Sequence, residues 1–143
     1  MVWSVVLALP EDQPLTARKV VHWSELRGET LLLSQHGPGP EFHKLLVSKM
    51  GGSDPCPVLR HDVALERLLT LVGAGWGVLL ALEGATGAAY PGASFREVRD
   101  ADGPTRMSFR AYWRHANSDP SLRPFLDLLR ERYPDLSAAT GIG

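Results

Sequence analysis

The sequence lacks disulfide partners and an excess of charge of either sign. Cys56 is the one cysteine in 143 residues, so no intramolecular disulfide can form and a disulfide-stapled secreted scaffold is excluded. The 15 basic and 16 acidic residues leave a formal charge of -1. Because this balance gives no basic surface to hold phosphates, we expect no direct DNA contact by this chain.

Long apolar runs are also missing. The segment Val2 to Leu9 is interrupted by Ser4 and stopped by Pro10, well short of the roughly 20 residues that cross a bilayer. No basic leader precedes it, and no small-residue cleavage site follows it. We therefore expect neither a membrane span nor a signal peptide, and we expect a cytoplasmic protein.

Motifs for metal binding and for covalent catalysis are absent as well. The five histidines are His22, His36, His43, His61 and His115. No two of them are four residues apart and Cys56 has no Cys-x-x-Cys partner, so we expect no metal and no cofactor. Ser34 lacks the Gly-x-Ser-x-Gly surroundings of a hydrolase nucleophile. Nothing next to Cys56 lowers its pKa, which favours a structural role for this residue.

The glycines of Gly73-Ala74-Gly75-Trp76-Gly77 are superficially like a phosphate-binding loop. A dinucleotide-binding loop follows a strand and opens a helix, whereas these glycines follow a helical pattern and precede an apolar strand. Glycine at this place is typical of a helix C-terminus. The segment therefore predicts the end of a helix.

Two helical patterns alternate with three short apolar runs. The runs are 30–34, 58–61 and 78–82, and each is too short for a helix. Between the first two, Pro40 opens a helix that ends at Gly51, and between the last two, Asp62 is the expected N-cap of a helix that continues to Trp76. The order βαβαβ predicts an α/β fold with a parallel core sheet and right-handed crossovers. With 44% hydrophobic residues, the chain can form one packed domain.

The flanking segments predict further short elements. Val2 to Leu9, Ser94 to Val98 and Arg106 to Arg114 are expected strands, and Trp23 to Gly28 and Ala85 to Tyr90 are expected helical turns. A last helix carries one apolar stripe and starts after Asp119 or Ser121. The stripe consists of Leu122, Phe125, Leu126, Leu129 and Tyr133.

The two βα junctions, 34–40 and 61–63, are the expected ligand site. Both follow parallel strands, and helix N-termini at that sheet edge present free amides and a partial positive charge. An anionic small molecule suits such an edge, where His36 and His61 would add hydrogen bonds or charge and Phe42 an apolar wall. The same residues are also compatible with ordinary solvated turns.

Three segments in order carry a family resemblance. They are Trp23-Ser24-Glu25-Leu26-Arg27-Gly28-Glu29-Thr30-Leu31-Leu32-Leu33, the helix and turn from Leu68 to Leu80, and Asn117-Ser118-Asp119-Pro120-Ser121-Leu122 with the helix that follows. The chain resembles the effector-binding domain of LysR-type transcriptional regulators. That resemblance implies two α/β subdomains like those of type 2 periplasmic binding proteins.

The resemblance also implies an incomplete domain. Residues 16–100 match a complete second subdomain, and residues 1–15 and 101–136 match crossover strands and a remnant of the first; 137–143 is expected to be a loose tail. The helix-turn-helix of the family and half of its first subdomain have no counterpart, so one wall of the cleft would be missing.

By the same resemblance, the second-subdomain wall of the effector cleft would be formed at two junctions. Its expected residues are Gln35, His36, Pro40, Glu41 and Phe42, followed by the junction at His61 and Asp62. The implied ligand is a small effector, anionic or aromatic and expected to be a carboxylate, that is sensed without catalysis. The family pairs through these domains, and the exposed apolar stripe of the last helix favours a homodimer.

Two other functions stay open at this point. The first is a small α/β enzyme acting on an anionic substrate through His36, His61 or Cys56, which would require a nucleophile and a base in one pocket. The second is a dimerisation module that binds no ligand.

Overall fold

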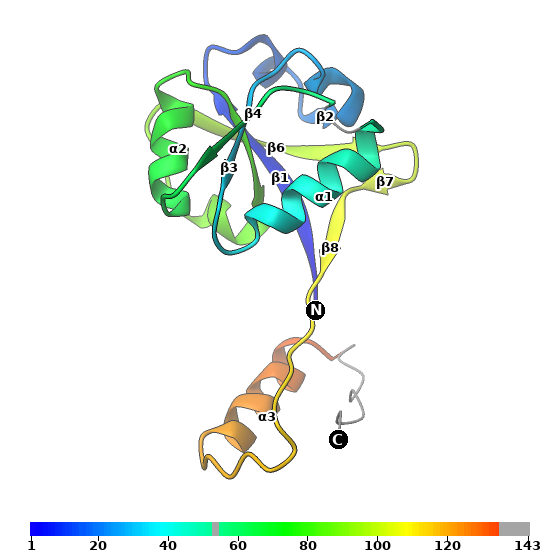
Figure 1. Cartoon of the computed structure of the whole chain (residues 1–143), viewed down its shortest axis with the longest axis vertical. Coiled ribbons are helices and arrows are strands. Elements are labelled where there is room, and N and C mark those ends of the chain that lie inside the picture. The colour runs from blue at the N-terminus through cyan, green and yellow to red at the C-terminus, as the bar shows by residue number, and fades with distance from the viewer. Residues whose placement is uncertain (53–54, 135–143) are drawn as a thin grey trace. The chain divides into compact units, whose positions relative to one another are not determined.

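A mixed sheet forms the core of most of the chain in the computed structural model, which describes residues 1–52 and 55–134 (Figure 1). Its main strands run in the order β2-β6-β1-β5-β3-β4, with β7 paired to β6 and β8 to β1. The strands are β1 (Val2–Pro10), β2 (Val20–His22), β3 (Leu31–Ser34), β4 (Val58–His61), β5 (Val78–Leu82), β6 (Ala93–Asp100), β7 (Gly103–Pro104) and β8 (Arg106–Ser108).

The predicted βαβαβ core is confirmed. Strand β3 lies between β4 and β5 and is parallel to both. Helix α1 (Gly39–Met50) connects β3 to β4, and α2 (Leu65–Gly73) connects β4 to β5. Strand β1 is antiparallel to both of its neighbours, β5 and β6, which makes the sheet mixed around a parallel core.

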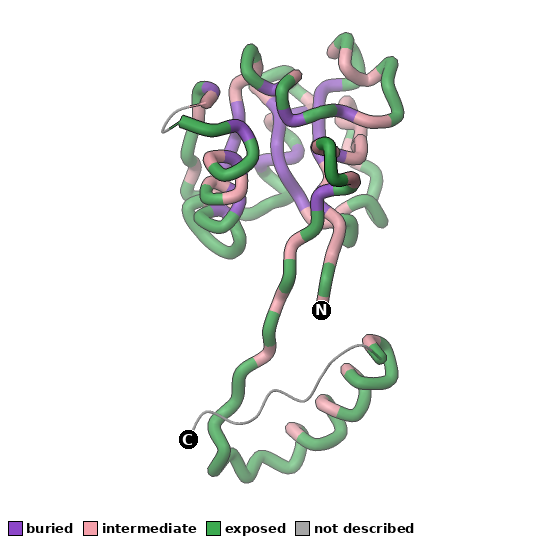
Figure 2. Tube along the Cα trace, turned by 90° about the vertical axis from the view of Figure 1, so that its right-hand side faces the viewer, coloured by how far each residue is buried: buried purple, intermediate pink, exposed green. Residues whose placement is uncertain are grey.

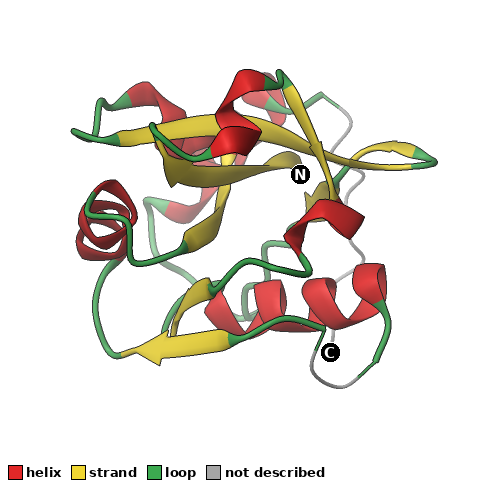
Figure 3. Cartoon of the chain, turned by 90° about the horizontal axis from the view of Figure 1, so that it is seen from above, coloured by secondary structure: helices red, strands yellow, loops and turns green. Residues whose placement is uncertain are grey.

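The two helices cover opposite faces of this core. Leu32 packs in one buried cluster with Leu68, Leu69 and Val72 of α2. Neighbouring side chains of a strand point to opposite faces, so Leu31 and Leu33 point away from α2, toward the face where α1 contacts β3. Figure 3 shows helices on either side of the strands. All three leucines of β3 are almost completely buried, which explains why this strand is continuously apolar.

Glycine ends both helices where the sequence predicts it. Gly51 follows α1 with a φ of 72°, in the left-handed region that favours glycine. A Cβ on Gly73 at the end of α2 would lie 2.2 Å from the Pro91 carbonyl oxygen, so the backbone passes too close for a side chain. A Cβ on Gly39 would lie 1.8 Å from the Ser34 carbonyl oxygen, so the start of α1 packs directly against the end of β3.

Three predicted boundaries are wrong. The helix predicted to continue to Trp76 ends at Gly73. Asp62 is not the N-cap of α2, because the helix begins three residues later and its cap is Ala64, which has no side-chain acceptor. The predicted strand Arg106 to Arg114 ends at Ser108. Backbone bonds between Phe109 and Met1 follow it, and no described strand pairs with residues 110–114. A strand needs a hydrogen-bonding neighbour, and the alternating pattern of Met107, Phe109 and Ala111 did not reveal that one was absent.

The remaining connections are short 3-10 helices. These are η1 (Pro14–Ala17), η2 (Trp23–Leu26) and η3 (Glu83–Gly87). The turn predicted at Trp23 is confirmed as η2, and the turn predicted from Ala85 begins two residues earlier as η3. The sequence did not predict β2, whose three residues are too few for a periodic pattern. Trp76 lies beyond α2 in a turn, with 61% of its surface exposed.

The chain divides into a larger unit, Ser4–Arg106, and a smaller unit that joins Met1–Trp3 to the residues from Met107 onward. In the smaller unit the Trp3 and Phe109 rings lie 5.5 Å apart. Its helix α3 (Leu122–Arg132) starts after Ser121, which settles the two predicted caps in favour of Ser121. No residue from 107 to 134 is buried, whereas most residues of β1, β3 and β5 are buried or partly buried in the larger unit (Figure 2). The predicted loose tail, 137–143, lies outside the described residues.

Candidate functional site

The two predicted junctions lie next to each other at the carboxyl edge of the parallel strands. Ser34 at the end of β3 is the register partner of His61 at the end of β4. The Gln35 amide donates to the His61 carbonyl oxygen at 2.9 Å, which extends the pairing one residue beyond β3. The topology therefore joins two segments 26 residues apart, as the parallel order of the strands predicts.

Ser34 holds both junctions in place. Its Oγ donates to the Val63 carbonyl oxygen at 3.0 Å and accepts a hydrogen bond from the His36 amide at 3.1 Å. One hydroxyl can donate once and accept twice, so this geometry uses its donor fully. A serine singled out as a poor hydrolase nucleophile is thus a structural link between the two loops.

A side-chain contact also joins the two loops. His36 Nε2 contacts Asp62 Oδ1, and both side chains are largely exposed, at 70% and 74%. Exposed pairs contribute little to stability, about 0–1 kcal/mol. The contact is more informative about position, because it places an ionisable imidazole and a carboxylate together at the sheet edge.

His61 differs from His36 in its surroundings. Its Nε2 is buried and has no hydrogen-bond partner among the described residues. Buried polar atoms are usually paired, so such an atom is an exception that functional sites often contain. The residue is partly accessible and immediately precedes Asp62 at the end of β4.

The first turn of α1 is only partly available to a ligand. The Gly39 amide donates to the His36 carbonyl, the Phe42 amide donates to the Pro38 carbonyl, and Pro40 has no amide hydrogen. This leaves the Glu41 amide as the first-turn donor without a backbone acceptor in the described part of the chain. At the start of α2, the amides of Leu65 and Glu66 likewise have no backbone acceptor among the described residues.

The other predicted site residues differ in exposure. Gln35, Pro40 and Glu41 are exposed, and the Glu41 carboxylate accepts from Lys44 Nζ at 3.0 Å. Phe42 is only 4% exposed, so it supports the start of α1 from the core and offers a ligand little of its ring. An open aromatic wall, as the sequence led us to expect at Phe42, is therefore not present in this arrangement.

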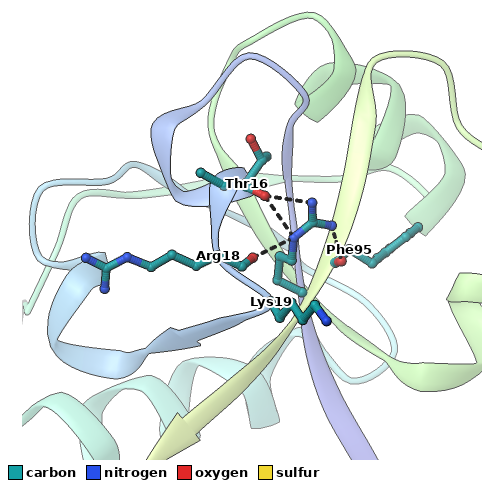
Figure 4. A pocket seen from close by; sticks show the side chains of 6 residues that line it. Thr16, Arg18, Lys19 and Phe95 are labelled. Atoms are coloured by element: carbon teal, nitrogen blue, oxygen red, sulfur yellow. Dashed lines mark hydrogen bonds between the residues drawn. The ribbon is translucent and has the colours of Figure 1, made fainter.

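A second hollow lies against η1 and β6, and sequence reasoning did not single it out. It has a volume of about 440 Å³ and is lined by Thr16, Ala17, Arg18, Lys19, Phe95 and Arg96. The Arg96 guanidinium donates to the carbonyl oxygens of Thr16, Arg18 and Phe95 (Figure 4). Because these bonds occupy the guanidinium, Arg96 fixes the connection from β1 to β2. No local sequence pattern marks this role, since Thr16 and Arg18 precede Arg96 by 80 and 78 residues.

The geometry does not assemble the enzyme considered as an alternative. Cys56 precedes β4, whereas His36 follows β3 and His61 is the last residue of β4. At about 3.3 Å per residue, the length of β4 alone separates the thiol from these histidines. Burial raises the pKa of the Cys56 thiol, which makes it a poorer nucleophile.

Within residues 1–52 and 55–134, no three side chains of histidine, cysteine, aspartate or glutamate gather where they could hold a metal ion. In the same ranges, none of the helices combines the length and the apolar character that a membrane crossing requires.

The model of the LysR substrate binding domain matches residues 2–134 of the chain. The chain belongs to this family of LysR substrate-binding domains. The family is a non-catalytic regulatory family that acts in transcription regulation, so the enzyme alternative is wrong. No curated protein matches the chain by sequence.

Solved structures of LysR effector domains share the fold. The effector binding domain of a BenM variant matches with a TM-score of 0.71 and 18% identity, over 94% of this chain and 62% of that one. The BenM effector binding domain with its effector benzoate matches with a TM-score of 0.68 and 17% identity, over 100% and 66%. The regulatory domain of MetR, a LysR family regulator from N. meningitidis, matches with a TM-score of 0.59 and 21% identity, over 92% and 60%.

These matches confirm the predicted fold class, a mixed α/β sheet with a parallel core like that of periplasmic binding proteins. At such identities they show the fold alone. The chain spans 62% of the length of the BenM variant domain.

Proposed function

We propose that this effector-binding domain senses a small carboxylate at the edge formed by the 34–42 and 61–66 segments. The observation that carries this proposal is the direct bonding of the two junctions, Gln35 to His61 and His36 to Asp62, at the carboxyl ends of adjacent parallel strands. Ligands of open α/β sheets bind at that edge. The ligand is sensed without bond making, and the resulting signal belongs to a cytoplasmic regulator of transcription.

The charge arrangement at this edge favours a ligand carboxylate that competes with the protein's own carboxylates for their partners. The amides of Glu41, Leu65 and Glu66 supply donors, and the N-termini of α1 and α2 supply partial positive charge. The carboxylate of Asp62 already holds His36, and Glu41 holds Lys44. An effector carboxylate would replace Asp62 as the partner of His36. Binding of the effector would therefore release the 61–63 loop from this contact.

The benzoate named with the BenM effector domain supports an aromatic carboxylate as the first ligand to try. Phe42 would then contact the ring only at its edge, since so little of it is exposed. The predicted cleft residues Gln35, Pro40 and Glu41 would surround the ligand from the solvent side. The assignment of residues 16–100 to a second subdomain is part of the same proposal.

A thermal-shift screen of small carboxylates, with benzoate as the first probe, tests the site. A ligand that binds only the folded chain stabilises it by about 2.7 kcal/mol at a concentration 100 times its Kd. We expect a concentration-dependent rise in Tm for the unaltered chain and the loss of that rise in His36→Ala. The matched control is His115→Ala, an exposed histidine of the smaller unit that should keep the full rise.

The screen contradicts the proposal if no carboxylate raises the Tm, or if His36→Ala responds as fully as the control. The first result would favour the module that binds no ligand.

We also propose that the chain forms a homodimer. Helix α3 exposes Phe125 and Leu128 at 54% and 60%, and Tyr112 is 70% exposed in the segment that precedes it. Phe125 and Leu128 are three residues apart and so are neighbours on the helix surface, and exposed apolar patches mark interaction sites. Sedimentation of the chain and of Phe125→Ser/Leu128→Ser measures this directly, with a dimer expected for the first and a monomer for the second. A monomer in both cases would contradict the proposal.

A further inference from the structure

Another pocket, distinct from the hollow at Arg96, lies where α1 ends and β4 begins, away from the junction edge. It has a volume of about 590 Å³ and is lined by Arg27, Pro55, Cys56, Pro57, Val58 and Arg60. Small-molecule sites typically have volumes of about 300–1,000 Å³. The pocket is therefore large enough for a metabolite, and none of its lining residues belongs to the 34–42 and 61–66 segments of the site already proposed.

Arg27 is oriented toward this pocket by a backbone bond. Its Nη2 donates to the Met50 carbonyl oxygen at 2.8 Å, at the last residue of α1. This bond uses one of five guanidinium donors and neutralises a carbonyl whose partial negative charge would otherwise oppose an anion. No other side chain or carbonyl of the described residues bonds to the remaining donors of Arg27, which can therefore take part in binding.

Arg60 comes to the pocket from the edge strand β4. Val58 and Arg60 alternate with Leu59, so they share one face of the strand and both line the pocket. Arg18 and Arg99 each contact a carboxylate, whereas Arg27 and Arg60 form no ion pair within the described part of the chain. Two guanidinium groups thus border one hollow, and no acidic side chain among residues 1–52 and 55–134 pairs with either of them.

The rest of the lining is rigid and apolar. Cys56 is 7% exposed, and burial raises the pKa of its thiol, so at neutral pH it is an uncharged wall. Pro55 and Pro57 flank it and restrict the backbone. The Pro57 carbonyl accepts from the Leu31 amide at 2.8 Å, which ties this rim to β3.

We propose that this pocket binds the oxyanion group of a small molecule, a carboxylate or a phosphate, between the guanidinium groups of Arg27 and Arg60. The planar guanidinium matches both kinds of oxyanion with paired hydrogen bonds. The apolar body of the ligand would lie against Pro55, Pro57 and Val58. The site is independent of the effector edge and adds a second input to the domain.

The single cysteine gives this pocket its own reporter. We would measure the rate at which a thiol reagent modifies Cys56 in the full chain, with inorganic phosphate or benzoate added at constant ionic strength set by chloride. Because Cys56 is the one cysteine of the chain, the signal comes from this pocket alone. We expect saturable slowing with at least one of the two probes, and the more effective probe identifies the oxyanion.

Two arginine variants test the assigned contacts. Each charge-assisted contact is worth about tenfold in affinity, so Arg27→Met and Arg60→Met should each weaken the protection about tenfold. Arg67→Met is the matched control at an exposed arginine outside the pocket, and it should behave like the unaltered chain. His36→Ala should also leave the protection unchanged, so failure at the effector edge is distinguishable from failure here.

The proposal is overturned if neither phosphate nor benzoate slows the modification of Cys56 beyond the chloride control. Equal protection in Arg60→Met and in the Arg67→Met control would overturn it as well. Arg60 is exposed on an edge strand, so this variant decides the question even if Arg27→Met, which loses the bond to Met50, fails to fold.

Discussion

Helices α2 and α3 carry similar apolar stripes but differ in burial. Leu68, Leu69 and Val72 of α2 are completely buried against the sheet, whereas no residue of α3 is buried. The stripe alone therefore predicts that a helix forms and which side is apolar. It does not predict whether the described chain supplies a surface to cover that side.

The largest expected effect comes from truncating the buried stripe. Leu69→Ala removes a completely buried side chain and leaves a cavity, which costs about 2–5 kcal/mol in the free energy of unfolding. Leu128→Ala in α3 removes a side chain that is 60% exposed in the single chain, so at concentrations below those that form the dimer we expect a change within about 0.5 kcal/mol. Urea unfolding of the two variants measures the difference.

Equal losses in the two leucine variants at higher concentrations would show that α3 is covered in solution. That result would erase the difference between the helices and would strengthen the case for the homodimer.

A smaller effect is expected at the close backbone contact that ends α2. Gly73→Ala would place a Cβ 2.2 Å from the Pro91 carbonyl oxygen, so the loop before β6 must shift, at a cost of about 1–3 kcal/mol. Gly84→Ala is the matched control, because nothing lies within 4 Å of its added Cβ. Thermal unfolding should show a lower Tm for the first variant alone. A common Tm would mean that the Gly73–Pro91 contact does not hold α2 in place.

The smallest effect concerns the ion pair between Lys49 of α1 and Asp100 of β6. The side-chain hydrogen bond from Lys49, helped by the Asp102 amide, lowers the pKa of Asp100 below its ordinary 3.8. A carboxylate whose pKa is lower in the folded chain adds stability above the unfolded pKa and loses it as the pH falls through the folded pKa. Asp100→Asn should therefore reduce the loss of unfolding free energy that the chain shows as the pH falls from about 5 to about 2. An unchanged loss would show that the pair has no influence on folding.

Much of the larger unit was predictable because its signals are local. The apolar runs at 31–33 and 78–82, Pro40 at the start of α1 and the glycines after both helices each predict one element, and their order predicts the parallel core. The errors arise where the decisive partner is distant. Asp62 has the chemistry of an N-cap, yet it lies too far before α2 and contacts His36 from another loop.

The candidate site was predictable only in part for the same reason. Parallel topology brings the junctions at Ser34 and His61 together, so their proximity follows from the sequence. The depth of Phe42 and the carbonyl bonds of Arg96 depend on packing between segments far apart in the chain. Periodicity within a segment contains no information on such contacts.

The most direct test of the effector site is a titration of the isotopically labelled chain with benzoate, followed by amide NMR. The account predicts saturable shifts at the Glu41, Leu65 and Glu66 amides, together with the His36 ring. Saturable shifts that leave these four groups unmoved, or no saturable shift with any carboxylate, would contradict it.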